Sequence, residues 1–451
     1  MSKERITICG AGLVGSLLSI YLIQRGFSVR VIEKRQNPLK SVNDSSRSIN
    51  LAISHRGLHA LAKALPGLDA EVLNNLAVPM YGRRIHGIDG NLSFQAYGKS
   101  DQYINSIGRG SLNQLLIRKA LNLGVDFLFE YTCDAYNEAD QVWSFISGTG
   151  DKILTSPNEI VIGADGAFSV IRENLFSTED KKYKLATLDY GYIELDISAE
   201  QAKGSMDSDS LHIWPRERFM LIALPNNDGS LTATLFLPFE GDVSFYGLKT
   251  EKNINDFFDK YFSDAKKIIP DLNKQFNLHP VSGLFLVHAD KWSNSHSLLI
   301  GDAAHALVPF YGQGMNAGFE DCRILAEIMD NQSDLNWEKI FKEFFSQRKN
   351  NADAISELAL QNFTEMRDLV ADRSFLVRKQ IESYIASVFP DLFIPQYTMV
   401  SFTDIPYSEA FQTGNRHKEL LNKIMCVSGI EAEWPNDLLR EKVKKIALTF
   451  L

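Results

Sequence analysis

The glycine-rich stretch GAGLVG, at residues 10–15, constrains the fold of this chain more than any other segment. An apolar run, ITICG (6–10), precedes it and is typical of a buried strand. An apolar helical pattern follows over roughly 13–25, and then a second strand-like run, FSVRVIE (27–33). This order predicts a β-α-β unit of the Rossmann-like kind, in which a tight turn joins the first strand to the helix.

The three glycines and one acid of this unit have separate physical tasks. Gly10 permits the tight turn, Gly12 lets the backbone approach a pyrophosphate, and Gly15 lets the helix pack close to the strand. The helix N-terminus offers amide N–H groups to phosphates, and Glu33, at the end of the second strand, can accept hydrogen bonds from a ribose. The unit therefore predicts a dinucleotide site, against the alternative of a glycine-rich turn without a ligand.

Two later motifs repeat the arrangement of an acid between an apolar strand and a helix start. One is GADGAFSVIR (163–172), which contains Asp165, and the other is GDAAHALVPFYGQGMNAGFED (301–321), which contains Asp302. Such an acid can hydrogen-bond hydroxyl groups of a ligand, or it can simply cap the helix that follows. Their occurrence after GAGLVG in this order favours the first interpretation.

The remaining pattern predicts a mixed α/β fold with an inserted β-sheet and a helical end. Strand-like runs with turn residues between them dominate residues 183–240 and predict an antiparallel sheet, whereas the chain from about 315 is mainly helical. We predict a discontinuous Rossmann-like domain that binds the dinucleotide, an antiparallel β-sheet substrate-binding domain, and a C-terminal helical region. Their expected ranges are, in that order, 1–72, 100–177 and 283–335; 73–99 and 178–282; and 336–451.

Charge and cysteine content restrict the class of protein. A net charge of −9 argues against nucleic acid or an anionic membrane as the main partner. The four cysteines contain no CxxC pair, which fits a reducing cytoplasm and predicts neither disulfides nor a bound metal. No apolar run approaches the ~20 residues of a membrane span. We expect a cytoplasmic monomer or homodimer that binds no nucleic acid.

Together the three motifs resemble the signatures of the FAD-dependent aromatic hydroxylases, the single-component flavin monooxygenases. The resemblance implies that GAGLVG holds the ADP half of FAD, that GADGA serves both FAD and NADPH, and that Asp302 hydrogen-bonds the ribityl chain. It also implies that the loop and helix of the third motif lie beside the flavin ring, where a helix N-terminus stabilises the charge of reduced flavin. The implied FAD contacts are Gly10, Gly12, Val14, Gly15, Glu33, Lys34, Arg35, Ala52, Arg109, Cys133, Asp165, Val170, Asp302, Gly314, Met315 and Asn316, of which Cys133 and Val170 depart from the family pattern.

Within that family the chain is similar to the branch that acts on L-kynurenine. The similarity runs from about residue 5 to 410. It rests on RSINLAISHRG (47–57), YGRRIHGIDG (81–90), LHIWPRERFMLIALPN (211–226), GQGMNAGFEDC (312–322), QNFTEMRDLV (361–370) and FIPQYTMVSF (393–402). It implies hydroxylation of L-kynurenine to 3-hydroxy-L-kynurenine with NADPH and O2, through a flavin C4a-hydroperoxide, in tryptophan degradation toward NAD. Since eukaryotic members end in a membrane anchor, the resemblance also implies a soluble, bacterial-type form.

The same resemblance assigns the substrate contacts to Arg83, Tyr97, Asn362 and Tyr397. A guanidinium and two phenols suit the carboxylate of an amino acid, and an amide serves charged ends without adding charge. The neighbouring Arg84 is the competing candidate, and its side chain should point to the opposite face of an extended segment.

No side chain is expected to carry the chemistry itself, because the flavin does. Phe236, in the apolar run LTATLFLPF, is our candidate for a residue facing the substrate ring. We interpret His86 and His305 as structural hydrogen-bonding residues, not as catalytic bases. Two other functions share the flavin motifs: a sister hydroxylase of a phenolic acid, and a flavoprotein that senses redox state without oxygenation.

Overall fold

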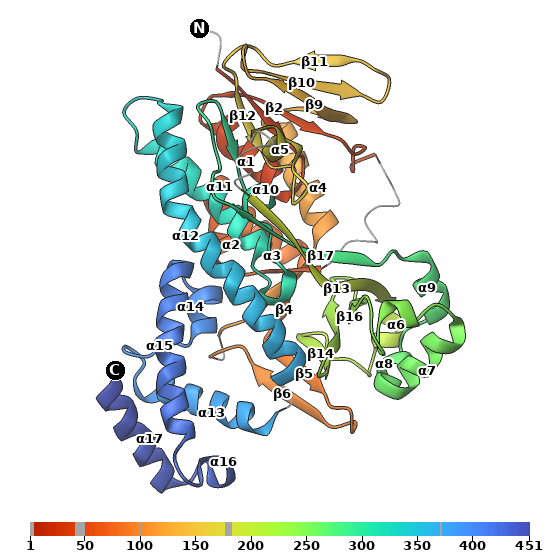
Figure 1. Cartoon of the computed structure of the whole chain (residues 1–451), viewed down its shortest axis with the longest axis vertical. Helices are drawn as coiled ribbons and strands as arrows, with labels where there is room; N and C mark the ends of the chain where they lie inside the picture. The colour runs from red at the N-terminus through yellow and green to blue at the C-terminus, as the bar shows by residue number, and fades with distance from the viewer. Residues whose placement is uncertain (1–3, 41–49, 100, 176–182, 370–371) are drawn as a thin grey trace.

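The computed structural model describes residues 4–40, 50–99, 101–175, 183–369 and 372–451, apart from the side chains of residues 368 and 369 (Figure 1). The start of the 47–57 stretch and the end of the 361–370 stretch lie outside these residues. In the described part of the chain, the first sheet is parallel and five-stranded. Its strands in spatial order are β18 (Ser297–Leu299), β12 (Ile160–Gly163), β1 (Arg5–Cys9), β2 (Ser28–Glu33) and β8 (Asp126–Phe129).

Helix α1 (Leu13–Gln24) follows the glycine turn and packs between two other helices, α4 (Arg109–Asn122) and α11 (Gly314–Asp330). The turn is sterically restricted to glycine. Gly10 has a φ of +105°, and a Cβ there would lie 2.4 Å from the carbonyl oxygen of Ala164. A Cβ on Gly15 would lie 2.0 Å from the carbonyl oxygen of Gly10. Both roles inferred from the sequence are therefore confirmed.

A seven-stranded sheet forms the centre of the second half of the molecule (Figure 1). Its order is β17 (Ser282–Ala289), β13 (Tyr183–Ile197), β16 (Leu231–Pro238), β15 (Phe219–Pro225), β14 (Ser210–Arg216), β5 (Gly82–His86) and β6 (Leu92–Ala96). Alternate residues of its strands point to opposite faces. One face packs on α7 (Glu251–Tyr261), α8 (Ser263–Lys266) and α9 (Leu272–Leu278), and the other faces the C-terminal helices.

Two small sheets and several short helices complete the part of the chain that precedes α11. One sheet has the order β11 (Lys152–Leu154), β10 (Val142–Ser147), β9 (Tyr131–Asn137), and the other has the order β3 (Asn50–Ile53), β7 (Ile104–Gly108), β4 (Ala77–Met80). The short helices are α2 (His55–Ala64), α3 (Leu68–Asn75), α5 (Val170–Leu175), α6 (Ala199–Ala202) and α10 (Asp302–His305).

Helices make up the rest of the chain, drawn in cyan and blue in Figure 1. They are α12 (Trp337–Thr364), the π-helical turn η3 (Glu365–Leu369), α13 (Arg373–Val388), α14 (Gln396–Phe402), α15 (Tyr407–Met425), α16 (Ile430–Glu433) and α17 (Asp437–Phe450). Within the described residues, no helix is both long and apolar enough to cross a membrane. The predicted mixed α/β architecture is confirmed, whereas the helices α7–α9 and the two small sheets were not predicted.

A buried network of charges joins α11 to its neighbours. Glu320 accepts hydrogen bonds from Arg56 of α2 and Arg348 of α12, each at 2.6 Å. Asp321 is held by Arg348 and His305, also at 2.6 Å each. All five residues are at most 4% exposed. Burial opposes ionisation of Asp321, but His305 and Arg348 outweigh it and lower the pKa of the carboxyl.

We predict that Arg348→Met destabilises the fold by about 3–5 kcal/mol, because removal of one partner leaves buried carboxylates without full compensation. The control is Lys342→Met on the same helix, where the ion pair with Glu338 is solvent-exposed and contributes little. Urea unfolding followed by circular dichroism measures both. Equal unfolding midpoints for the two variants would contradict the assigned importance of the network.

Candidate functional site

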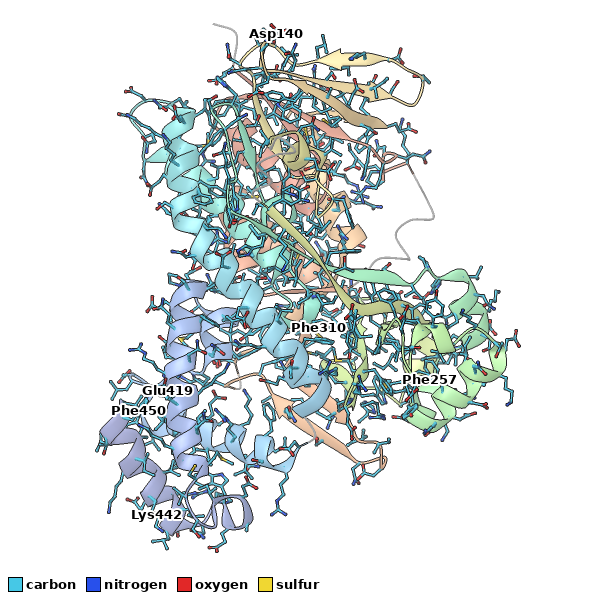
Figure 2. All side chains as sticks on the ribbon, viewed as in Figure 1. Asp140, Phe257, Phe310, Glu419, Lys442 and Phe450 are labelled. Carbon is cyan, nitrogen blue, oxygen red and sulfur yellow. The ribbon has the colours of Figure 1, made fainter. Side chains whose placement is uncertain are left out.

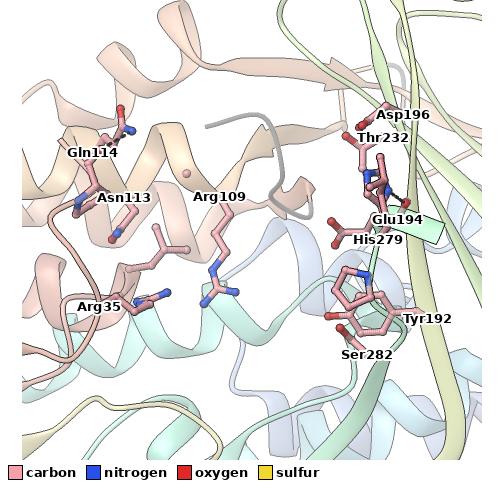
Figure 3. A pocket seen from close by; sticks show the side chains of 16 residues that line it. Arg35, Arg109, Asn113, Gln114, Tyr192, Glu194, Asp196, Thr232, His279 and Ser282 are labelled. Atoms are coloured by element: carbon pink, nitrogen blue, oxygen red, sulfur yellow. Dashed lines mark hydrogen bonds between the residues drawn. The ribbon is translucent and has the colours of Figure 1, made fainter. Parts of the chain in front are cut away.

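A cavity of about 500 Å³ lies between the first β-α-β unit and the seven-stranded sheet (Figure 3). Its two walls are formed by different parts of the chain. The first wall comes from the start of α1, the end of β2 and the start of α4, and the second from β13, β16 and the segment before β17. The polar lining residues include Gly12, Arg35, Arg109, Asn113 and Gln114 on the first wall, and Tyr192, Glu194, Asp196, Thr232, His279 and Ser282 on the second.

The start of α1 opens into this cavity. Gly12 is the N-cap residue, no side chain caps the helix there, and a Cβ on Gly12 would meet nothing within 4 Å. Arg35 and Arg109 line the same space. A helix N-terminus with two nearby guanidinium groups suits a pyrophosphate. Three residues predicted from the sequence are therefore brought together here.

Glu33 lies at the end of β2 beside this helix start. Its carboxylate accepts a hydrogen bond from the backbone N–H of Ala11 at 2.8 Å and two from Arg35 at 2.9 Å. Burial opposes ionisation, but the hydrogen bonds and charge of Arg35 outweigh it and lower the pKa of Glu33. The acid is therefore held ionised as an acceptor at the place where the sequence predicted one.

The two later acids differ in what they bind. Asp302, the first residue of α10, is exposed and makes no hydrogen bond or ion pair with another described residue. The surrounding protein nevertheless displaces enough water to raise its pKa. Asp165 instead accepts hydrogen bonds from the Ser169 hydroxyl at 2.5 Å and from the backbone N–H of Val170 at 2.8 Å. Asp165 therefore caps the start of α5, the alternative interpretation of this motif, whereas Asp302 remains available to a ligand.

The polar side chain of Asn316, near the N-terminus of α11, is hydrogen-bonded within the protein. The Asn316 amide donates to the carbonyls of Ala52 and Gly312 at 2.8 Å each, and its oxygen accepts from the N–H of Ser54. This side chain therefore fixes the β3–α2 turn against α11 and has little capacity left for a cofactor. Gly314 begins α11, and a Cβ there would meet nothing within 4 Å.

The other predicted FAD contacts lie around this core. The Val14 side chain packs beneath Gly301 and Gly318. Cys133 lies on β9, where burial raises the pKa of its thiol to about 12. The predicted residues Lys34, Val170 and Met315 are respectively exposed, half-buried and buried, and do not line the cavity.

A second cluster forms on the other side of the seven-stranded sheet from α7–α9. The Arg83 guanidinium lies 5.6 Å from the Tyr97 ring centre and 5.5 Å from that of Tyr397. The two rings stack at 5.3 Å, and Tyr311 stacks on Tyr397 at 5.6 Å. Glu365 of η3 lies 3.5 Å from Arg83. The predicted arginine and both tyrosines therefore meet, although their elements are far apart in sequence.

Two polar atoms in this cluster are buried without a hydrogen-bond partner: Nε of Arg83 and the hydroxyl of Tyr97. Burial opposes the charge on Arg83, but the nearby Tyr397, Tyr97 and Glu365 outweigh it and raise its pKa. Burial also raises the pKa of Tyr97 and Tyr397, so both remain neutral phenols able to donate. Unsatisfied buried donors are rare in folded proteins, so these two groups are available to an acceptor such as a ligand or a water molecule.

Aromatic residues adjoin this polar group. Phe236 of β16 lies 4.9 Å from Phe310, which stacks on Phe363 of α12 at 4.1 Å. Figure 2 shows Phe310 between α12 and the sheet. The Asn362 amide donates to the Phe310 carbonyl at 2.6 Å and so anchors this wall. Phe236 thus lies beside the predicted substrate residues.

Three residues that the sequence left as alternatives are committed elsewhere. Arg84 is paired with Asp207, on the opposite side of β5 from the Arg83–Glu365 pair. His86 bonds Asp264 at 3.0 Å and His212 at 2.9 Å, and it stacks on Trp214. His305 belongs to the buried network of α11. All three have structural hydrogen bonds, as interpreted from the sequence for the two histidines.

Sequence reasoning missed Glu365 and Tyr311 in the arginine cluster, and Asn113 and His279 in the cavity. Tyr311 lies within the quoted 301–321 motif and could have been considered. Glu365 follows Asn362 by three residues, one helical turn, which places both on the same side of the helix end. The cavity residues carry no motif that distinguishes them from ordinary polar residues.

Comparison with known proteins gives the family. The family described as "FAD binding domain" matches residues 3–333. The chain is 60% identical over 449 residues to the kynurenine 3-monooxygenase of Cytophaga hutchinsonii, with 100% of both chains covered. It is 41% identical to that of Dictyostelium discoideum, covering 94% of this chain and 93% of the relative.

Solved structures share the fold at low identity. The 2-methyl-3-hydroxypyridine-5-carboxylic acid oxygenase superposes with a TM-score of 0.66 at 19% identity, covering 83% of this chain and 95% of the other. The tetracycline destructase Tet(55) superposes with a TM-score of 0.62 at 18% identity, covering 87% and 98%. The full-length identity to the curated relatives is decisive: the chain belongs to the kynurenine 3-monooxygenase family and carries that family's FAD-binding domain.

Proposed function

We propose that this chain hydroxylates L-kynurenine at the ring carbon beside the amino group, giving 3-hydroxy-L-kynurenine. One atom of O2 enters the ring and the other leaves as water, while NADPH is oxidised to NADP+ and one proton is consumed. Such a reaction belongs to tryptophan degradation. The observation that carries the proposal is the buried Arg83, whose Nε lies unpaired next to the unpaired hydroxyl of Tyr97.

Arg83 is suited to hold the substrate carboxylate. A guanidinium binds a carboxylate through two parallel hydrogen bonds, and the phenols of Tyr97 and Tyr397 can add further donors. Glu365, 3.5 Å from Arg83, is suited to the substrate's ammonium group. The cluster thus offers one charge for each end of a zwitterionic amino acid.

The aromatic wall of Phe236, Phe310 and Phe363 would receive the aminophenyl ring and exclude water. Each of these residues is at most 7% exposed. Asn362 would act indirectly, since its amide holds the Phe310 carbonyl. In such a reaction the protein orients the substrate and excludes water from the reacting atoms.

Bound FAD would supply the redox chemistry, in which two electrons come from NADPH and one oxygen atom passes to the ring. Gly12, Glu33, Arg35 and Arg109 are placed to hold the ADP half, and Asp302 to hydrogen-bond a hydroxyl group. We propose that NADPH docks transiently at the same face. The proposed domains keep their predicted ranges, except that β17 pairs with β13 and so belongs with the antiparallel sheet.

The alternatives fit this cluster less well. A phenolic acid has no ammonium group, so binding it beside Arg83 would leave Glu365 without a partner from the substrate. A redox sensor would need no buried arginine with an unsatisfied Nε beside a buried aromatic wall. Both alternatives share the FAD cavity, and therefore only the Arg83 cluster separates them from the proposed function.

The first prediction of this proposal concerns the cofactor. Asp302→Ala should weaken FAD binding by roughly tenfold, because a charge-assisted hydrogen bond to the ligand is lost. The control is Asp334→Ala, an exposed aspartate outside the cavity. Titration of apoprotein with FAD, followed by flavin fluorescence, gives both dissociation constants. Equal constants would remove Asp302 from the site.

The second prediction concerns the substrate. Arg83→Ala should weaken L-kynurenine binding by about ten- to a hundredfold, because it removes charge-assisted hydrogen bonds. The affinity of Arg83→Lys for L-kynurenine should lie between those of the wild type and Arg83→Ala, since lysine keeps the charge but lacks the planar guanidinium. The neighbouring Arg84→Ala is the matched control and should bind normally. Kynurenine titration of the flavin absorbance reports all four proteins, each with its FAD content measured.

Two outcomes of that titration would count against the proposal. Loss of affinity in Arg84→Ala alone would show that the adjacent arginine was the right choice. Unchanged affinity in every variant, with normal FAD content, would favour the phenolic-acid hydroxylase.

The third prediction concerns shielding from water. Phe236→Ala should lower the ratio of hydroxylated product to NADPH consumed, because water can enter the opened pocket and oxygen is diverted to H2O2. The control is Phe219→Ala, which removes a buried ring from the opposite face of the same sheet, where it packs on Phe257. Both variants should lose stability, and only Phe236→Ala should lose coupling. An unchanged ratio in Phe236→Ala would place the substrate ring elsewhere.

A further inference from the structure

Three potential metal ligands converge on the surface, away from the Arg83 cluster. His55 and His59 lie four residues apart on α2, so that both point from one side of the helix. Asp404 lies in the connection between α14 and α15. Its two carboxylate oxygens are 2.9 Å from Nε2 of His55 and 3.1 Å from Nδ1 of His59.

The distances are close to those of a tetrahedral metal centre. With bonds of about 2.0–2.1 Å, neighbouring ligand atoms of tetrahedral zinc lie about 3.3 Å apart. Here one ligand atom from each of the three residues lies within 4.8 Å of the others. A shift of these exposed side chains by about an ångström would bring the three ligand atoms to the spacing of a tetrahedral zinc site. The side chains of His55, His59 and Asp404 are 43%, 28% and 43% exposed, so an ion and a water molecule as fourth ligand can enter.

Nothing among the described residues competes for this acid. The ion pairs of Asp404 are with the two histidines alone, and no lysine or arginine neutralises it. Arg56, between the histidines in sequence, points inward to the carbonyls of Val400 and Ile405 and to Glu320. Two imidazoles and a carboxylate are a donor set that zinc accepts well.

We propose that His55, His59 and Asp404 bind one divalent transition-metal ion, of which zinc is the best match. The ion would join α2, within the FAD-binding domain, to the α14–α15 connection. Because α14 carries Tyr397, the ion would also fasten one wall of the proposed kynurenine pocket. The binding itself is independent of the proposed function and is tested without turnover.

The experiment titrates ZnCl2 into the untagged, FAD-loaded protein by isothermal calorimetry. We expect one ion per chain, with affinity weakened about tenfold or more in His55→Ala, His59→Ala and Asp404→Asn, since each loses one of three ligands. The matched control is His288→Ala, an exposed histidine paired with Asp353 outside the cluster, which should bind zinc as the wild type does.

Thermal unfolding with and without ZnCl2 provides the second measurement. Zinc should raise the unfolding temperature of the wild type and of His288→Ala, and EDTA should reverse the increase, because the folded state alone presents the three ligands together. Comparison of each variant with itself removes any effect of the substitution on basal stability. Absence of zinc binding by the wild type, or equal binding by the wild type and the three cluster variants, would overturn the proposal.

Discussion

The buried pair Glu320–Asp321 on α11 is the interaction on which the rest of the structure depends. Its two carboxylates are bound by Arg56 of α2 and Arg348 of α12, and Asp321 also accepts from the backbone N–H of Gly301. A buried ion pair is costly to desolvate and contributes little net stability. The pair connects α11 to α2, to α12 and to the backbone at Gly301, so that these elements are positioned relative to one another by the same two carboxylates.

The dinucleotide half of the site could be predicted from sequence because its determinants are local. A steric requirement for glycine and the place of Glu33 at a strand end follow from twenty-four residues, 10–33, read in order. The Arg83 cluster could not be found in this way. It assembles β5, the end of β6, η3 and α14, and only resemblance to a family could group them. Alternation along a strand predicted only that Arg83 and Arg84 point to opposite faces, and the choice of Arg83 rested on the family resemblance.

The residue types alone did not distinguish side chains available to a ligand from side chains with a structural role. Asp165 and Asp302 occupy equivalent positions in their motifs, yet Asp165 caps α5 and Asp302 faces open space. Asn316, which the resemblance implied as a cofactor contact, also ties Ala52 to α11 through its amide. The three-ligand cluster at His55 was missed because the search for metals followed cysteine spacing. The spacing of His55 and His59, four residues apart, could have been recognised as a possible pair of metal ligands. Asp404 could not, because it lies 345 residues beyond His59.

The uncharged connection of residues 306–313, between α10 and α11, lies between the two halves of the proposed site, which explains its composition. Asp302 precedes it on the side of the proposed FAD site. Phe310 and Tyr311 within it contact Phe236 and Tyr397, and the buried Glu320 and Asp321 follow it on α11. A charged side chain within the loop would be desolvated against the aromatic wall or would compete with the network below. The connection therefore presents backbone groups and uncharged side chains, which suits the proposed dry pocket next to a flavin. Its position follows from the network beneath it, so a change that weakens the Arg348 pairs should disturb coupling and cofactor binding together.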